Sequence, residues 1–391
     1  MTRKKILVLD GRSLASLAIA RSLGSKGLEI HCGDSFKSNL TSYSKYVKKQ
    51  FIYPDPKNDK NEFVEWVLNT VKENDYDLVL PVRDDTTLLL AKYQEEISEY
   101  TNLYLSDFNT VKKLNDKAET VKVAQKNDIP TPRTWFPEET PVEEIKEEIK
   151  YPILIRPRTG SGSRGIKYVK EPRGFDDAYD SVSQNFGMPM VQEFVEQEEY
   201  MTTCLLLDDD QKSIGEFSYR RTKEFPVSGG PTVVGISTEE TTAKSSAKKL
   251  LEKVSWKGPA EVEFVVDETG IPKILEVNPR FWMPLQLAIK SGVDFPYLIY
   301  RLSQDEEIES VNTYETGIKY RWVLPNEFLW FLNSQDKISG IKELLQNFWE
   351  KDVCYGTLSR VDPLPIMGTI AQSMSFMLKK EKRKQVLDRG W

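Results

Sequence analysis

One stretch decides the fold: Ala260-Glu261-Val262-Glu263-Phe264-Val265-Val266, then Asp267-Glu268-Thr269-Gly270, then Lys273-Ile274-Leu275-Glu276-Val277-Asn278, closed by Pro279-Arg280. The outer runs alternate polar and apolar residues, as half-buried strands do, and the middle run has turn chemistry. In a hairpin symmetric about Thr269 and Gly270, Glu263 lies opposite Glu276, and Glu261 lies opposite Asn278. These four side chains then share one face, and Val262, Phe264, Leu275 and Val277 share the other.

The polar face predicts a magnesium site. Directly opposed residues lie roughly 4.5–5.5 Å apart at Cβ, so two carboxylates there repel each other and a cation relieves the repulsion. Glu263, Glu276 and Asn278 offer two carboxylates and an amide oxygen, hard ligands that suit Mg²⁺ bridging nucleotide phosphates. A solvated sheet face could carry the same residues, so the pair alone leaves both interpretations open.

Length and composition restrict the class of protein. A chain of 391 residues exceeds the usual single core, so two or three domains are expected. The net charge of -6 gives no global attraction to nucleic acid. Three cysteines without paired spacing fit a reducing compartment, and His31, the only histidine, excludes a multi-histidine metal site. With no signal peptide and no apolar run of about 20 residues, we expect a cytoplasmic protein.

The N-terminal part predicts a doubly wound parallel sheet. Residues 5–9 form an apolar strand, 14–23 a helix and 28–32 a second strand, and the helix at 61–73 and strand at 78–80 continue the pattern. The first turn reads Asp10-Gly11-Arg12-Ser13, without the G-x-G-x-x-G fingerprint of dinucleotide binding. A nicotinamide dehydrogenase is therefore disfavoured.

The rest of the chain alternates helices and strands. We expect helices at about 110–127, 142–150, 242–254, 280–292 and 296–302, and strands at 152–157, 190–194 and 201–207. Beyond about residue 305 the pattern is irregular and helical.

A glycine-rich loop is the first candidate for nucleotide binding. Thr159-Gly160-Ser161-Gly162-Ser163-Arg164-Gly165 follows the strand that ends at Arg156. Its backbone N–H groups can fold over phosphates. Because residues 166–169 resemble a strand and no Gly-Lys-Ser/Thr closes the loop, it is a lid between strands and not a P-loop. An ordinary flexible turn has the same composition.

Two cations and one further strand complete the candidates. Arg156 can grip phosphate oxygens, and Lys117, near the centre of its expected helix, can do the same or be a solvated lysine. Phe194 and Val195 can flank a purine, and a nearby carboxylate such as Glu199 can bind ribose hydroxyls. Singly, these glutamates equally suit a charged surface.

The collinear order of these features resembles the ATP-grasp superfamily of carboxylate–amine and carboxylate–thiol ligases. The likeness covers about residues 1–302 and is most specific at 274–280, closest to the carbamoyl-phosphate-synthetase-like large-subunit module. It implies an α/β fold, with an N-terminal doubly wound parallel-sheet domain, an ATP-grasp module of two α+β subdomains, and a mostly helical C-terminal tail. The implied boundaries are 1–109, 110–190 (with the lid), 191–304 (with the metal site) and 305–391.

The resemblance also implies roles for matching residues, with ATP and Mg²⁺ (or Mn²⁺) as cofactors. Lys117 and Arg156 match the phosphate-gripping cations; Gly160, Ser161, Gly162, Ser163 and Gly165 the lid; Glu193, Phe194 and Val195 the adenine-contacting strand; Glu199 the ribose carboxylate; Glu263, Glu276 and Asn278 the metal ligands; and Arg280 the arginine beside the transferred phosphate. The second cation is often lysine in other branches. No histidine stands in the acceptor region, where some relatives have one.

The implied activity is an ADP-forming ligase that activates a small carboxylate as an acyl phosphate for attack by an amine or amino acid. Arg220 and Arg221, which lead into Ser228-Gly229-Gly230-Pro231-Thr232, are candidates for holding the acceptor, although a surface loop could carry them too. Asp85, at a strand end, could hold an amino group or cap a helix. The alternatives are a bicarbonate-using carboxylase or carbamoyl-phosphate-type enzyme, and a non-catalytic ATP-binding regulatory protein.

The tail allows two interpretations. The aromatic runs at 328–332 and 348–349 are expected to pack against the main body. The apolar run 369–378, followed by the basic run 379–384, is typical of an amphipathic helix with an electrostatic anchor. A weak peripheral contact with a membrane or another protein is therefore the second interpretation. The sequence predicts neither the substrates nor the oligomeric state.

Overall fold

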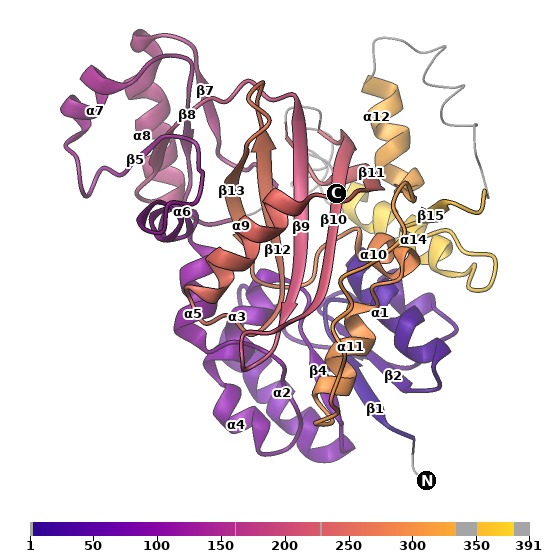
Figure 1. Cartoon of the computed structure of the whole chain (residues 1–391). Helices are drawn as coiled ribbons and strands as arrows, with labels where there is room; N and C mark the ends of the chain where they lie inside the picture. The colour runs from indigo at the N-terminus through magenta and orange to yellow at the C-terminus, as the bar shows by residue number, and fades with distance from the viewer. Residues whose placement is uncertain (1–2, 161, 227–228, 334–349, 379–391) are drawn as a thin grey trace.

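The computed structural model describes residues 3–160, 162–226, 229–333 and 350–378, which three sheets organise (Figure 1). The N-terminal sheet is parallel with order β3-β2-β1-β4, which confirms the doubly wound start. Its elements are β1 (Lys5–Val8), α1 (Leu14–Ser25), β2 (Glu29–Asp34), η1 (Thr41–Tyr43), β3 (Val47–Ile52), α2 (Lys60–Asn74), β4 (Leu78–Leu80), α3 (Asp84–Lys92) and α4 (Gln94–Ser98). Strand β3 was not expected, because as an edge strand it exposes most of its side chains and shows no apolar run.

The second sheet has the order β5-β8-β6-β7 and is antiparallel. Its elements are α5 (Phe108–Asn115), α6 (Lys117–Lys126), β5 (Thr134–Trp135), α7 (Val142–Glu148), β6 (Ile153–Arg156), β7 (Lys167–Val169), η2 (Pro172–Gly174), α8 (Phe175–Phe186) and β8 (Met190–Glu193). Because β6 pairs with β7, the glycine-rich loop is a connection between two strands, as expected.

The single helix expected over 110–127 is wrong. The Asp116 carboxylate accepts the backbone N–H groups of Ala118 and Glu119, at 2.8 and 3.3 Å, and thereby caps the start of a new helix. Lys117 is consequently the first residue of α6 and does not lie near a helix centre.

The third sheet has seven strands in the order β13-β12-β9-β10-β11-β14-β15, with β9, β10, β12 and β13 side by side in Figure 1. Its elements are β9 (Glu199–Leu207), β10 (Ser213–Glu224), β11 (Thr232–Ser237), α9 (Thr241–Glu252), β12 (Gly258–Val266), β13 (Pro272–Asn278), α10 (Leu285–Ser291), α11 (Phe295–Leu302), β14 (Lys319–Arg321), η3 (Val323–Glu327), α12 (Phe328–Asn333), β15 (Val353–Tyr355) and α14 (Pro365–Leu378). The C-terminal region supplies the expected helices, and it also adds β14 and β15 to this sheet.

The hairpin β12–β13 has the expected register at its polar end. Glu263 pairs with Glu276 and Glu261 with Asn278, but a bulge then shifts Phe264 opposite Ile274. Ile274 therefore lies in the buried core, whereas Leu275, expected on that apolar face, lines the cavity described below. This corrects the face assigned to Leu275.

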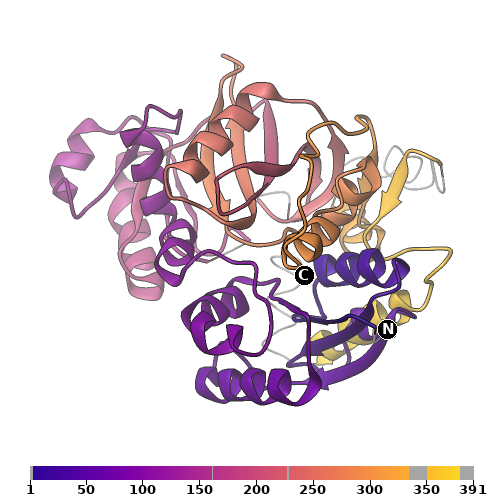
Figure 2. The ribbon, with the colours of Figure 1, turned by 60° about the horizontal axis from the view of Figure 1, so that its bottom comes forward.

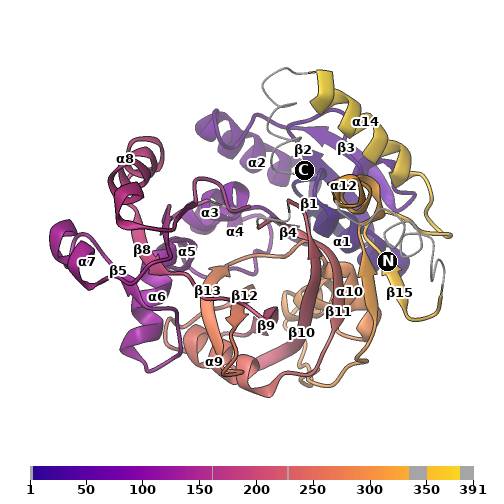
Figure 3. The ribbon, with the colours of Figure 1, turned by 90° about the horizontal axis from the view of Figure 1, so that it is seen from above.

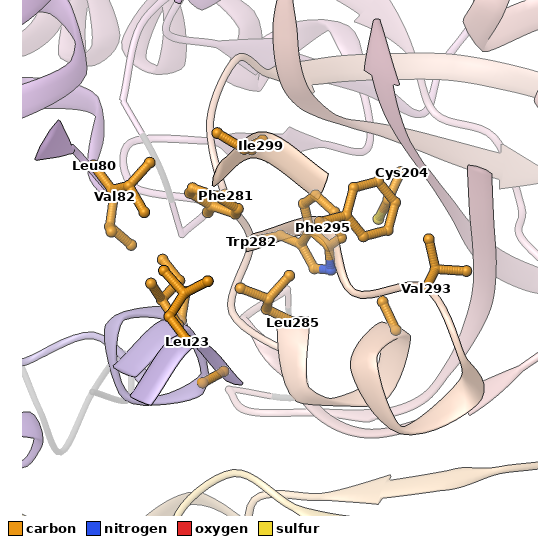
Figure 4. Close-up of a cluster of buried hydrophobic side chains, with 14 of the residues drawn as sticks. Leu23, Leu80, Val82, Cys204, Phe281, Trp282, Leu285, Val293, Phe295 and Ile299 are labelled. Atoms are coloured by element: carbon orange, nitrogen blue, oxygen red, sulfur yellow. The ribbon is translucent and has the colours of Figure 1, made fainter. Parts of the chain in front are cut away.

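A shared core fixes the N-terminal sheet against the large sheet. Figure 4 shows Leu80 and Val82, from the end of β4, on the side of Phe281, in the same buried cluster as Trp282 and Phe295. Figure 2 shows these two parts of the fold packed together, with the α6–α8 region beside them. The carboxyl edge of the parallel sheet therefore lies close to the end of β13. Among the described helices, none is long and apolar enough to cross a membrane.

The described part of the tail packs against the body. Leu329 and Trp330 lie against Phe225, Val233 and Val234, as expected for the first aromatic run. Phe348, Trp349 and the basic run 379–384 lie outside the described residues. α14 lies at the periphery, next to η1 and the N-terminal sheet (Figure 3).

Candidate active site

A cavity of about 590 Å³ is lined by residues of the second and third sheets and by residues that follow β1 and β4 of the N-terminal sheet. The sequence-predicted residues that line it are Lys117, Arg156, Gly160, Gly162, Ser163, Glu193, Phe194, Val195, Arg221, Glu263, Glu276, Asn278 and Arg280. Gly165, Glu199 and Arg220 are not among the lining residues, and Ser161 lies outside the described residues. Residues from segments more than 100 positions apart thus meet in one place.

Glu276 pairs with both candidate cations, Lys117 and Arg156. Its Oε2 accepts a hydrogen bond from Arg156 Nη2 at 3.0 Å and lies 3.5 Å from Lys117 Nζ. Burial raises the pKa of Glu276, but Lys117 and then Arg156 outweigh burial and hold the pKa below its usual value. Arg156 also donates to Gln192 at 2.7 Å, so its orientation is fixed from the other side.

Glu263 and Glu261 form the other half of the acidic face. Glu263 accepts from Arg221 Nη2 at 2.6 Å, and Glu261 accepts from Tyr219 Oη at 2.8 Å. Burial, and then the neighbouring Glu263, raise the pKa of Glu261 to about 7. Glu261 and Glu263 lie on the same face of β12, so their carboxylates repel each other, and a cation would relieve this repulsion.

Asn278 stands between these carboxylates and Arg280. Its Nδ2 donates to Glu261 and Glu263, each at 3.0 Å, and its Oδ1 accepts from Arg280 Nη2 at 2.9 Å. A half-turn about the Cβ–Cγ bond would aim the amide oxygen at the carboxylates, where it could join them in binding a divalent cation. Across the described residues, no group of three or more His, Cys, Asp or Glu side chains forms a metal site by itself. The candidate donor set, Glu263, Glu276 and Asn278, instead combines two carboxylates with one amide.

Arg280 is held by a carboxylate from the N-terminal domain. Its Nε lies 2.5 Å from Asp84 Oδ1, at the first residue of α3. Burial raises the pKa of Asp84, but Arg280 outweighs it and lowers the pKa overall. The sequence placed Asp84 at a sheet edge without a role and favoured Asp85, which does not line the cavity.

The glycine-rich loop and an apolar wall both line the cavity. Lys117 Nζ donates to the carbonyl of Gly160 at 2.6 Å, which links this candidate cation to the glycine-rich loop. Phe194, Leu154 and Leu275 line the same cavity, so an apolar wall is available for a flat ring. Gly165 has φ +79°, and a Cβ there would lie 2.5 Å from the ring of Phe186, so it shapes the base of the lid.

Glu199 and Arg220 are not brought into the cavity. Their side chains form an ion pair with each other at 3.1 Å. Because successive residues of a strand point to opposite faces, Arg220 and Arg221 on β10 point to opposite sides of the sheet. Only Arg221 of this pair reaches the carboxylates of the cavity.

Several lining residues were missed by the sequence. Glu224, next to the glycine pair at 229–230, lines the cavity, and burial followed by the charge of Glu263 raises its pKa to about 7. Gln372 and Ser373 of α14 line the end near Arg12. Nothing in the local sequence marks Gln372 and Ser373, because their position at the cavity depends on how α14 packs.

Comparison with known proteins places this fold in a class. Residues 114–284 match the family model described as ATP-grasp domain. The chain is 23% identical over 233 residues to a biotin carboxylase of Nostoc sp., covering 56% of this chain and 52% of the relative, or about half of its length. It is 25% identical over 203 residues to a D-alanine–D-alanine ligase of Francisella tularensis, covering 49% of this chain and 67% of the relative.

Solved structures share the fold over most of the chain. A biotin carboxylase from Campylobacter jejuni has a TM-score of 0.67 at 15% identity, covering 81% of this chain and 74% of that one. An L-amino acid ligase from Bacillus licheniformis has a TM-score of 0.59 at 17% identity, covering 79% and 76%. The chain therefore shares its fold with these enzymes over most of its length. This chain contains an ATP-grasp domain at residues 114–284, which confirms the resemblance.

Proposed function

We propose that this protein is an ATP-dependent, ADP-forming ligase that activates a small carboxylate as an acyl phosphate for attack by an amine or amino acid. One observation carries the proposal. Lys117, Arg156 and Arg280 converge with Glu263 and Glu276 in a single cavity, and ion pairs and hydrogen bonds fix their positions. Such a set of cations and oxygen ligands suits the phosphates of a nucleotide and a divalent cation.

The lining of this cavity suits ATP and Mg²⁺ (or Mn²⁺). Phe194 and Val195 would contact the base, and Lys117 with Arg156 would grip the phosphates. Glu263, Glu276 and Asn278 would hold the divalent cation, which supplies charge neutralisation on the phosphates when bound. Two similar structures were solved with ADP: a Staphylococcus aureus N5-carboxyaminoimidazole synthetase, and, with MgADP, a 2-oxoglutarate carboxylase biotin carboxylase domain from Hydrogenobacter thermophilus.

The residues of the chain would then position the reacting groups. A carboxylate oxygen is a poor leaving group, so transfer of the γ-phosphoryl group to it makes an acyl phosphate that an amine can attack with release of phosphate. Arg280, held by Asp84, would stand beside the transferred group and stabilise the charge that develops on it. Arg221, at the opposite side of the carboxylates, would hold the acceptor or its acyl phosphate.

A second candidate is a carboxylase that phosphorylates bicarbonate. The likeness to biotin carboxylases in sequence and in fold favours it. A third candidate is an ATP-binding regulatory protein without turnover. In that case the arginines and carboxylates that line the cavity would have no catalytic role.

ADP release separates these candidates. The purified chain would be assayed with ATP and Mg²⁺ against panels of small carboxylates with amines, and against bicarbonate alone. We expect ADP release that requires both a carboxylate and an amine. Release with bicarbonate alone would favour the carboxylase, and no release with any pair would favour the regulatory protein.

Two arginine variants sharpen this assay. Arg280→Ala should lower ADP release by roughly 10- to 100-fold, the loss of one charge-assisted hydrogen bond in the transition state. Arg301→Ala is the matched control, because Arg301 also pairs with a carboxylate at 2.6 Å, Glu306 Oε2, but lies outside the cavity lining. Equal activity of the two variants would contradict the role of Arg280.

A further inference from the structure

The C-terminal helix α14 carries an exposed apolar ridge. Between residues 361 and 374 the large exposed side chains are Val361, Leu364, Met367, Ile370 and Met374, with relative exposures of 65%, 56%, 54%, 43% and 61%. From Leu364 onward they recur every three or four residues, which places them along one face of a helix. The helix has no charged residue, so no charge interrupts this ridge.

The opposite face of α14 is fastened to the body, which fixes the direction of the ridge. A Cβ on Gly368 would lie 2.7 Å from the Cα of Leu40, so the helix and that backbone are in close contact. Gln372 accepts from the N–H of Leu40 at 3.3 Å and donates to the carbonyl of Arg12 at 3.4 Å. Thr369 is buried between them. The ridge therefore faces outward because the other face of α14 packs against the body.

The sequence that follows α14 identifies the kind of surface that fits the ridge. Lys379-Lys380-Glu381-Lys382-Arg383-Lys384 comes directly after it, and residues 379–391 contain six basic and two acidic residues in a chain of net charge -6. An apolar ridge followed by a basic run complements a bilayer with anionic headgroups.

We propose that α14 docks this protein onto an anionic membrane surface as a peripheral protein. The ridge would enter the boundary between headgroups and acyl chains, and the basic run would lie among the headgroups. Each basic residue near such a surface contributes on the order of 1 kcal/mol, or about fivefold in affinity, and this part weakens with salt.

Vesicle co-sedimentation of the full chain tests the proposal. Vesicles of phosphatidylcholine with phosphatidylglycerol should bind the protein at least tenfold more tightly than phosphatidylcholine alone, and high salt should remove most of the difference. Substituting Met367, Ile370 and Met374 together by serine should reduce binding to the anionic vesicles at least tenfold. Replacing Lys379, Lys380 and Lys382 by glutamine should lower it to a similar extent.

A matched control keeps exposure and residue type while leaving α14 intact. Ile52, Met188 and Ile271 are 54%, 51% and 48% exposed, and their joint replacement by serine should leave vesicle binding unchanged. The thermal midpoint of each variant checks that it is folded.

Three results would overturn the proposal. The first is no binding to anionic vesicles, or equal binding to neutral ones. The second is a dimer in analytical ultracentrifugation that the ridge variant converts to a monomer, which would make a second copy the occupant. The third is stronger vesicle binding after deletion of 379–391, which would mean that the chain's own tail covers the ridge.

Discussion

Lys117 and Arg156, the proposed phosphate-binding cations, both contact Glu276, and this predicts coupled binding of nucleotide and metal. Arg156 donates to Glu276 at 3.0 Å, and Lys117 lies 3.5 Å from the same oxygen. Phosphate oxygens need the same N–H groups, so Glu276 competes with ATP for them. A divalent cation that binds Glu276 would end this competition. ATP and Mg²⁺ should therefore each strengthen the binding of the other.

The variant Glu276→Gln removes the charge and keeps the shape of the side chain. A hydrogen bond to a charged group contributes about 1.5–3 kcal/mol, or roughly 10- to 100-fold in affinity. Without Mg²⁺, the variant should therefore bind ATP about 10- to 100-fold more tightly than the wild type. With Mg²⁺ it should gain little, because the metal has lost a carboxylate ligand. Isothermal titration calorimetry with ATP, in EDTA and in Mg²⁺ at fixed ionic strength, measures both affinities.

The control lies on the same hairpin. Asp267 pairs with Lys273 at 2.7 Å outside the cavity lining, so Asp267→Asn also removes a carboxylate–lysine pair. This variant should match the wild type under both conditions. If Glu276→Gln left both the metal-free affinity and the strengthening by Mg²⁺ unchanged, the competition inferred from these distances would be refuted.

Three further predictions concern the acceptor, the lid and pH. Arg221→Ala should lower acceptor-dependent turnover roughly 10- to 100-fold, whereas Arg220→Ala, which breaks only the exposed pair with Glu199, should cost a factor of about five or less; equal losses would contradict this assignment. Amide hydrogen exchange at 162–165 should slow when ATP and Mg²⁺ bind, and identical exchange would count against a lid. The pKa of Glu224 is raised from 4.5 to about 7, so its contribution to the free energy of unfolding is present below pH 4.5 and lost as the pH rises through 7. Between pH 5 and 8, the loss of stability in urea unfolding should be smaller in Glu224→Gln than in the wild type by up to about 3 kcal/mol; an identical pH dependence in the variant would be inconsistent with this cause.

The sequence by itself determined the parts whose pattern is local. Alternation with period two on both sides of a short turn predicted the pairing of Glu263 with Glu276. The lid was predicted because Arg156 ends one strand and 166–169 begins another within a few residues. These features depend on neighbours along the chain, where strand period and turn chemistry act directly.

The tertiary structure alone decided which residues meet. Asp84 reaches Arg280 across 196 positions, and Gln372 reaches Arg12 across 360. The order of residues in the chain does not encode such approaches, since they depend on how the N-terminal sheet and α14 pack against the large sheet. Strands as short as β14 and β15 are too short to show a period, so only pairing with distant strands defines them.

Packing likewise decided toward which face of its sheet each strand residue points. One bulge moved Leu275 from the expected apolar face into the cavity. Arg220 and Arg221 are neighbours of the same type, and only their place on β10 sends one to the carboxylates and the other to Glu199. A one-residue shift in a strand exchanges its two faces, and only the pairing of the folded strands shows where such a shift falls.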